Sequence, residues 1–310
     1  MTARDLREPN GAGPSGLGSG GDLAARRRQF RALVEERQAV LLPGAANALT
    51  ARIAEDLGYR AVYLTGAGLT NTHLGLPDLG LMTLNDLAEA AARITDVCAL
   101  PLVADIDTGF GNAVNAYRSV RVMERAGAAA LQIEDQIFPK KCGHFSGKGV
   151  VPLAEMLGKI HACTDAREDE NLLIIARTDA RAVEGMAAAL DRAAAMAEAG
   201  ADIIFVEAPE SAEELRRIAA LPQPQLVNVV MGGRTPMLPL PELREAGFSL
   251  VLYANAALQA SILAIRQVLE RLRDGGSLHG AESLLASFED RQRVVRKDVF
   301  DALEARYAGR

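Results

Sequence analysis

The segment Leu131–Lys148, which reads LQIEDQIFPKKCGHFSGK, joins an apolar run to several side chains that could do chemistry. The run ends in the carboxylates Glu134 and Asp135, so a strand followed by a loop is predicted. The loop carries Lys140, Lys141, Cys142, Gly143 and His144. Neighbouring positive charge favours the ionised form of a thiol, and the sequence therefore predicts an increased thiolate fraction for Cys142. A solvated basic turn with an incidental cysteine is the simpler alternative.

A second group of reactive side chains consists of carboxylates that follow short apolar runs. Asp105 and Asp107 are two residues apart, so on a strand both would project to the same side, and Glu134 ends the next run. Carboxylates this close raise one another's pKa, so a cation is expected between them. Oxygen ligands favour a hard divalent ion, Mg²⁺ or Mn²⁺, over zinc. The histidines also disfavour zinc, because they lack helical pairing: His73, His144, His161 and His279.

Two further features could bind an anionic substrate. The glycine-rich segment Gly66–Thr83 lacks a phosphate-binding signature, but as a loop its backbone amides could hold a carboxylate, with Asp78 over the metal. Arg177 offers a bidentate fork to a second carboxylate. Two anion sites, a hard metal and a thiolate predict a small di- or tricarboxylic acid as the substrate.

The elements that would position these groups repeat along the chain. A helical stretch ends at a glycine and an apolar run follows, as at Gly58, Gly127, Gly200 and Gly247. The eight apolar runs are residues 39–43, 61–65, 101–107, 130–134, 172–177, 202–207, 225–230 and 249–253. The clearest helical stretches are residues 84–95, 113–126, 153–167, 183–199 and 212–220. Eight alternating strands and helices predict an α/β fold, a (β/α)8 TIM barrel.

Active sites of such barrels lie at the carboxyl ends of the strands. Most of the predicted strands end in a polar or charged residue. The residues at these ends are Thr65, Gly66, Ala67, Asp105, Asp107, Glu134, Arg177, Asp179, Glu207, Asn228 and Tyr253. Helix caps would explain one or two of these residues but not the whole set.

The two ends of the chain are expected to differ from the barrel. Residues 1–22 are predicted to be a disordered tail because they contain little apolar side chain, and residues 23–310 to be a single domain with a C-terminal helical extension. The helix predicted at residues 23–38 carries Arg26, Arg27 and Arg28, which are interpreted as a solvated face. A helix at 256–273 gathers apolar residues on one face, and we expect it to dock on another subunit.

The composition excludes several classes of function. The formal net charge of −6 provides no basic field, so nucleic acid is not expected as a partner. No stretch suggests a membrane span or a secretory signal. The 3 cysteines are widely spaced, which suits a reducing compartment and predicts a cytoplasmic protein.

Over residues 31–265 the sequence resembles the isocitrate lyase and phosphoenolpyruvate mutase superfamily. The motifs are YLTGAG (63–68), GLPDLG (75–80), ADIDTGFG (104–111), IEDQ (133–136), PKKCGH (139–144), ARTDA (176–180) and LVNVV (226–230). The resemblance implies a barrel whose eighth helix is swapped between subunits, and a homotetramer. It also implies Mg²⁺ near Asp105, held partly through water, with Asp78, Asp107 and Glu134 around it.

The resemblance also implies roles for individual residues. Substrate binding would fall to Thr65, Gly66, Ala67, Gly143, Arg177 and Asn228. Lys140, Cys142 and His144 would lie on a gating loop, where Cys142 donates a proton with support from His144 and Glu207. Tyr63 is the expected acceptor of the substrate hydroxyl proton.

Within the superfamily, the loop thiol favours carbon–carbon cleavage over phosphonate rearrangement. Gln132 and Thr65 replace the histidine and serine of methylisocitrate lyases, and Ala254 matches neither the serine of oxaloacetate hydrolases nor the proline of lyases. The continuation HFSGKGVV resembles the branch of 2,3-dimethylmalate lyase and oxaloacetate hydrolase.

The sequence thus predicts an Mg²⁺-dependent lyase that cleaves a 2-alkylmalate, such as 2,3-dimethylmalate, or 2-methylisocitrate to a 2-oxo acid and a second carboxylate. Three alternatives stay open. They are an oxaloacetate hydrolase or decarboxylase, a carboxyvinyl-carboxyphosphonate or phosphoenolpyruvate phosphonomutase, and a non-catalytic metabolite-binding protein.

Overall fold

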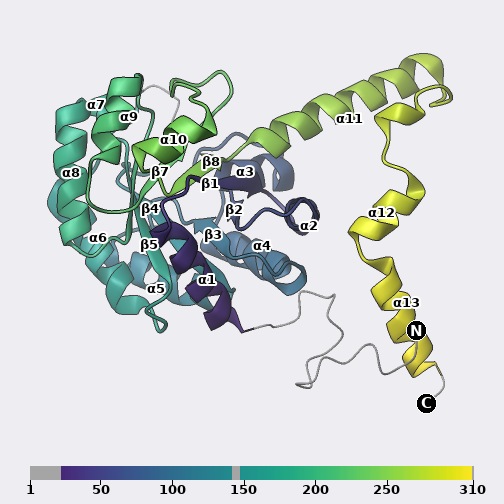
Figure 1. Cartoon of the computed structure of the whole chain (residues 1–310), viewed down its shortest axis with the longest axis horizontal. Helices are drawn as coiled ribbons and strands as arrows, with labels where there is room; N and C mark the ends of the chain where they lie inside the picture. The colour runs from purple at the N-terminus through teal and green to yellow at the C-terminus, as the bar shows by residue number, and fades with distance from the viewer. Residues whose placement is uncertain (1–21, 142–146, 309–310) are drawn as a thin grey trace.

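A computed structural model describes residues 22–141 and 147–308 of the chain. Within these residues, eight parallel strands close into a barrel in which β1 pairs with both β2 and β8 (Figure 1). They are β1 (Val40–Ala45), β2 (Val62–Leu64), β3 (Leu102–Asp105), β4 (Ala128–Glu134), β5 (Leu173–Thr178), β6 (Ile203–Val206), β7 (Gln225–Asn228) and β8 (Leu250–Tyr253). Each strand overlaps one of the apolar runs, so the predicted (β/α)8 barrel is confirmed.

Helices surround the barrel (Figure 1). They are α1 (Leu23–Glu35), α2 (Ala48–Asp56), α3 (Gly66–His73), α4 (Leu84–Val97), α5 (Ala113–Arg125), α6 (Leu153–Ala166), α7 (Ala180–Val183), α8 (Met186–Glu198), α9 (Ala212–Ala219) and α10 (Leu240–Ala246). The five helical stretches predicted between strands are confirmed in α4, α5, α6, α8 and α9. Helices α2 and α10 confirm the helical stretches that were expected to end at Gly58 and Gly247, although the sequence analysis gave no bounds for them.

Helix α3 corrects the prediction of a glycine-rich loop at residues 66–83. Its first turn is capped by Thr65, whose Oγ1 accepts a hydrogen bond from the backbone N–H of Gly68 at 3.1 Å. The cap offsets the low helix propensity of Gly66 and Gly68 at the helix start. The residues expected to bind a carboxylate, Thr65 to Ala67, therefore lie where strand β2 passes into a helix N-terminus, which favours anions.

Helix α1 packs at the end of the barrel where the strands begin. Phe30, Leu33 and Val34 join the apolar cluster inside the barrel. Arg26 donates from Nη1 to the carbonyls of Thr95 and Cys98, both at 3.0 Å, and is buried. The predicted solvated arginine face is therefore wrong for Arg26, because its guanidinium satisfies carbonyl groups at the end of helix α4.

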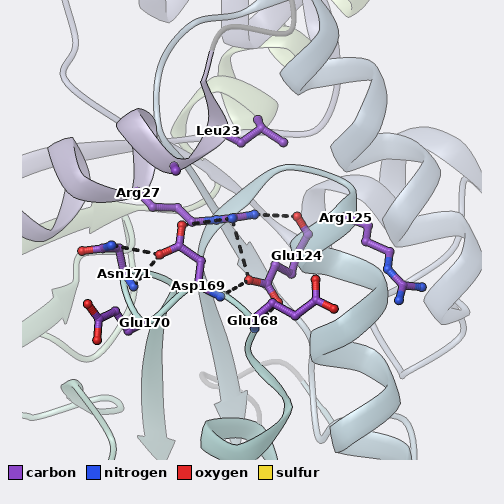
Figure 2. Close-up of a pocket in the computed structure, with 9 residues that line it drawn as sticks. Leu23, Arg27, Glu124, Arg125, Glu168, Asp169, Glu170 and Asn171 are labelled. Atoms are coloured by element: carbon purple, nitrogen blue, oxygen red, sulfur yellow. Dashed lines mark hydrogen bonds and ion pairs between the residues drawn. The ribbon is translucent and has the colours of Figure 1, made fainter.

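Arg27 is likewise buried, in the shallow pocket of Figure 2 at the same end of the barrel. It donates to the carbonyls of Ala128 at 3.0 Å and Glu124 at 2.7 Å, and its Nη1 lies 3.2 Å from Asp169 Oδ2. The Glu124 carboxylate in turn accepts the backbone N–H groups of residues 168 and 169. These satisfied contacts make the pocket a structural ion-pair cluster, and only Arg28 has the predicted exposed side chain.

The C-terminal segment leaves the barrel as an arm (Figure 1). It comprises α11 (Ala256–Gly275), the 3-10 helix η1 (Glu282–Leu284), α12 (Phe288–Val294) and α13 (Lys297–Tyr307). None of the residues of α11, all of which the structure describes, is buried, and Leu263, Ile265 and Leu269 are more than half exposed at 58%, 57% and 57%. The predicted helical extension is confirmed, and its apolar face has no covering element in the described chain. No described helix combines the length and apolar character that crossing a bilayer requires.

Candidate active site

One small cavity lies at the carboxyl ends of the strands and collects most of the predicted site residues. Its lining consists of Tyr63, Thr65, Ala67, Asp78, Asp105, Lys140, Lys141, Arg177, Phe205, Glu207, Asn228, Val230, Leu252, Ala254 and Asn255. Larger pockets lie elsewhere, but this one brings together acids, bases and amides from six strands. A barrel of parallel strands presents its strand ends on one rim, which explains why residues so distant in sequence meet here.

Lys140 lies at the centre of the acidic side of this cavity. Its Nζ is 2.6 Å from Asp78 Oδ1 and 2.8 Å from Asp107 Oδ1, and the side chain is buried. Burial alone lowers the pKa of Lys140, but the carboxylates of Asp107, Asp105, Glu134 and Asp78 outweigh it and raise the pKa well above its ordinary value. The ammonium is therefore charged and binds two of the predicted metal ligands.

The acidic groups themselves are held in a dry environment. Burial raises the pKa of Asp105 and raises that of Asp107 to about 6, although Lys140 opposes both shifts. Burial also raises the pKa of Glu134 well above its ordinary range, against the attraction of Arg177. Carboxylates that are costly to ionise gain from any additional cation that binds among them.

Asp107 joins the acidic cluster around Lys140 by a different route from the predicted one. Strand β3 ends at Asp105, and Asp107 has a left-handed backbone with φ of 49°. The backbone N–H of Asp107 donates to Asp105 Oδ1 at 3.0 Å, which stabilises this turn. The argument that both side chains project from one strand is wrong, yet the turn places the two carboxylates at the same point: a Cβ added to Gly66 would lie 3.3 Å from Asp105 Oδ2 and 3.3 Å from Asp107 Oδ1.

Arg177 is clamped by carboxylates on three sides. Its Nε and Nη2 donate to Asp179 at 2.9 and 3.2 Å, its Nη1 lies 3.3 Å from Glu134 Oε2, and its Nε lies 3.7 Å from Glu207 Oε2. The guanidinium also lies over the Phe205 ring, 5.3 Å from the centroid. The predicted substrate fork is thus held in one orientation, chiefly by Asp179, which the sequence placed at a strand end without assigning it a role.

Asp179 also connects the barrel to the loop that follows β4, at residues 136–148. Lys148, at the far end of that loop, places its Nζ 2.5 Å from Asp179 Oδ1, and both side chains are buried. At the near end, the Gln136 amide exchanges two hydrogen bonds of 2.9 Å with the backbone of Lys141. Cys142, Gly143 and His144 lie outside the described residues, so their predicted roles stay predictions. The spacing of the TDA sequence after Arg177 could have indicated Asp179 as its partner.

Tyr63 and Gln132 form a further buried link. The Tyr63 hydroxyl donates to Gln132 Oε1 at 2.7 Å, and Gln132 Nε2 donates to Asp105 Oδ1 at 3.0 Å. Burial, then the negative charge of Asp105, raises the pKa of Tyr63 well above its ordinary value. This environment disfavours ionisation of Tyr63, which weakens the expectation that it accepts a proton from the substrate.

The buried carboxylates of the site are suitable ligands for a hard divalent cation, although they do not form a complete set of ligands by themselves. Among residues 22–141 and 147–308, no group of three acidic, histidine or cysteine side chains converges closely enough to bind a metal on its own. Glu134 Oε1 is nevertheless buried and has no hydrogen-bond partner within the described chain. Buried carboxylate oxygens with raised pKa values suit Mg²⁺, which usually binds through one or two carboxylates and several waters.

Comparisons with known proteins agree with this geometry. The family described as phosphoenolpyruvate phosphomutase matches residues 30–273. The chain belongs to this family. It is an enzyme of the isocitrate lyase and PEP mutase superfamily, as its sequence resemblance implied.

Curated relatives include carbon–carbon lyases. The 2,3-dimethylmalate lyase of Eubacterium barkeri is 41% identical over 281 residues, which cover 90% of this chain and 97% of that protein. The 2-methylisocitrate lyase of Aeropyrum pernix is 47% identical over 249 residues, which cover 80% of each chain. The resemblance therefore extends over nearly the whole described barrel.

Solved structures share the fold at high similarity. An oxaloacetate acetylhydrolase in complex with 3,3-difluorooxalacetate superposes with a TM-score of 0.85 at 34% identity, covering 92% of this chain and 97% of that one. A phosphonopyruvate hydrolase in complex with oxalate and Mg²⁺ superposes with a TM-score of 0.83 at 30% identity, covering 91% and 99%. The superfamily thus supports lyase, hydrolase and mutase chemistry on one scaffold.

Proposed function

We propose that this enzyme is an Mg²⁺-dependent carbon–carbon lyase that cleaves a 2-hydroxy di- or tricarboxylate to a 2-oxo acid and a second carboxylate. The observation that carries the proposal is the mixed lining of the cavity. It combines Lys140, Arg177 and the buried carboxylates of Asp78, Asp105 and Glu207 with the apolar side chains of Phe205, Val230, Leu252 and Ala254. A substrate with carboxylates and an alkyl branch, such as 2,3-dimethylmalate, complements both kinds of side chain.

The residues of the cavity divide the work of binding. Thr65, Gly66 and Ala67 at the start of α3 would hold one substrate carboxylate, because amide groups at a helix N-terminus favour an anion. Arg177 would hold the other together with the N–H₂ group of Asn228, which lines the cavity, because a carboxylate binds to hydrogen-bond donors. These groups orient the substrate and exclude water from it.

The acidic side of the cavity would hold the metal. Asp105 and Glu134 would be oxygen donors to the ion, with Asp78 and Asp107 around it, and the ion would supply electrostatic stabilisation of the oxygen that gains charge during cleavage. Lys140 keeps Asp78 and Asp107 in place through its two ion pairs. Mn²⁺ has the same ligand preferences and would substitute.

The proton to the second fragment would come from Cys142, with His144 and Glu207 in support, and Gly143 would contribute to substrate binding. Replacement Cys142→Ala should abolish turnover and leave Mg²⁺-dependent binding of oxalate intact, since the thiol would donate a proton in the reaction and take no part in binding. Retained cleavage by this variant, measured as 2-oxo acid formed per minute, would remove the acid role of Cys142.

We also propose that the apolar face of α11 docks on a second copy of the chain. Exchanged α11 helices between two copies would cover Ile262, Ile265 and Leu269, which are exposed on one face of the helix, and two such dimers would make a homotetramer. A cytoplasmic location fits the buried, unpaired Cys98 and Cys163.

A panel assay tests the proposed function. The enzyme is incubated with Mg²⁺ and either 2,3-dimethylmalate, 2-methylisocitrate or oxaloacetate, and the products are identified by proton NMR. We expect a 2-oxo acid from at least one of the hydroxy acids, and no product after chelation of the metal.

Oxaloacetate hydrolysis is the second candidate, because the similarity to oxaloacetate acetylhydrolase is as close as a TM-score of 0.85. Formation of oxalate and acetate from oxaloacetate, without cleavage of either hydroxy acid, would replace the lyase assignment with this one.

A further inference from the structure

The buried link from Tyr63 through Gln132 to Asp105 determines which way each hydrogen bond runs. Gln132 lies on β4 with no exposed surface, and its amide bridges the Tyr63 oxygen at 2.7 Å and Asp105 Oδ1 at 3.0 Å. A glutamine amide has a donor end and an acceptor end, so fixing one end fixes the other.

The Asp105 end fixes the amide. Asp105 Oδ1 already accepts the backbone N–H of Asp107 at 3.0 Å, so this oxygen is an acceptor whether or not the carboxyl carries a proton on its other oxygen. With Asp105 ionised, or with its proton on Oδ2, the group of Gln132 that faces Oδ1 donates and is therefore Nε2. The reversed amide would place two acceptors 3.0 Å apart in a buried site, which is costly.

Oε1 of Gln132 consequently faces Tyr63 and can only accept. The Tyr63 hydroxyl therefore donates its single proton to Gln132 Oε1. Tyr63 also lines the cavity, where its oxygen can only accept a hydrogen bond. Passing the proton on to Gln132 is not an option, because a carboxamide oxygen is a very weak base. Tyr63 therefore presents an acceptor to any bound molecule and no donor.

We propose that Gln132 is a positioning residue that makes Tyr63 a selective acceptor, so that the site prefers a ligand hydroxyl to a ligand carbonyl at this point. The inference rests on the proposed function, whose substrate is a 2-hydroxy acid, and it names the protein group that recognises the hydroxyl. A hydroxyl donates to Tyr63, whereas a carbonyl would oppose one acceptor with another. Cleavage turns this hydroxyl into a carbonyl, so the same contact is lost in the 2-oxo product and favours its release.

Binding of two matched ligands tests the proposal. Malate and oxaloacetate differ only in a hydroxyl against a carbonyl, and their dissociation constants are measured at low temperature with Mg²⁺ for the intact enzyme, Tyr63→Phe and Gln132→Met. Loss of one hydrogen bond should make Tyr63→Phe bind malate about tenfold more weakly and oxaloacetate within about twofold of the intact enzyme. Gln132→Met frees the Tyr63 proton, and the preference for malate over oxaloacetate should fall about five- to tenfold.

Gln225→Met is the matched control, because Gln225 is equally buried on β7 and lies outside the cavity lining. Its ligand preference should equal that of the intact enzyme. Equal weakening of both ligands by Tyr63→Phe, or an unchanged preference in Gln132→Met, would overturn the proposal.

Neutron diffraction from a deuterated crystal decides the polarity without any ligand. A deuteron between Tyr63 and Gln132 Oε1, with the Nε2 deuterons directed at Asp105, is the expected result, and a Tyr63 deuteron that points into the cavity would contradict it. These measurements are separate from the turnover assay. If the enzyme prefers malate to oxaloacetate but cleaves no hydroxy acid, the proposed function is wrong and the proposed role of Gln132 is still supported.

Discussion

Replacing Lys140 by methionine probes the acidic side of the site most sharply. The substitution keeps most of the side-chain volume and removes only the ammonium that lies 2.6 Å from Asp78 and 2.8 Å from Asp107. The carboxylates then lose their nearest described cation while staying buried. We expect the metal-free protein to lose stability and Mg²⁺ to restore part of it.

The magnitude follows from the two distances. At an effective dielectric of about 20, each pair contributes about 6 kcal/mol of Coulomb attraction before desolvation is subtracted. Removing one partner of a buried pair leaves an uncompensated charge, and the expected net loss in free energy of unfolding is about 3 to 5 kcal/mol.

The loss should depend on pH with a defined sign. The pKa of Asp107 is raised to about 6 by burial even with Lys140 present, so the folded protein binds this proton more tightly than the unfolded chain does. Such a group favours the folded state in acid and costs stability as pH rises through its folded pKa. Without Lys140 this pKa rises further, so the destabilisation should be larger at pH 8 than at pH 5.

Urea unfolding of the chelator-treated protein at pH 5 and pH 8 measures both effects. Lys297→Met is the matched control: its ammonium pairs with Asp301, 2.6 Å away, but both side chains are about half exposed, at 53% and 55%. That pair should contribute less than about 1 kcal/mol. A Lys140→Met loss as small as that of the control, or one equal at both pH values, would refute the ion-pair account of the acidic cluster.

Two further predictions concern the close approach of α3 and the cysteines. Gly66→Ala places a Cβ 3.3 Å from both Asp105 Oδ2 and Asp107 Oδ1, so kcat/KM should fall at least about tenfold. In the control variant Gly158→Ala, in α6, the added Cβ has no atom within 4 Å, and kcat/KM should be unchanged. Equal kcat/KM values for the two variants would contradict the prediction, because they would show that Asp105 and Asp107 can move away from the added Cβ without loss of activity. Burial raises the pKa of Cys98 to about 11 and that of Cys163 to about 12, so both thiols stay protonated at pH 8. Iodoacetamide should therefore label only Cys142, one thiol per chain, and the Cys142→Ala variant should not be labelled. Labelling of Cys98 or Cys163 in the native protein, read by peptide mass spectrometry, would count against their burial.

Much of the fold was predictable because its signals are local. Apolar runs identified all eight strands, since a parallel strand buried on both faces needs an uninterrupted apolar stretch, and four of these runs follow a helix-ending glycine. Helix α3 was missed because glycine is a poor helix former, and only the Thr65 cap hints at it. The burial of Arg26 depends on carbonyl groups of α4, and no local pattern around the arginines contains that information.

The site was predictable where the strand-end rule applies and not where tertiary contacts decide. Asp105 and Arg177 line the cavity as expected, but the positive φ of Asp107 and the ion pairs of Lys140 arise from the packing of separate loops. Gln132 could have been found, because it lies two residues before Glu134 and side chains alternate along a strand. The same alternation would have found Phe205, two residues before Glu207.

The central claim is that these strand ends assemble a site for carbon–carbon cleavage of a 2-hydroxy acid. Carbon NMR of 2,3-dimethylmalate labelled at its hydroxyl-bearing carbon, incubated with enzyme and Mg²⁺, tests it most directly. The account predicts that the labelled carbon becomes the carbonyl of a 2-oxo acid, with one equivalent of a second carboxylate and with no conversion by Cys142→Ala. An unchanged spectrum for this and for the other hydroxy acids, beside conversion of oxaloacetate or of a phosphonate, would contradict it.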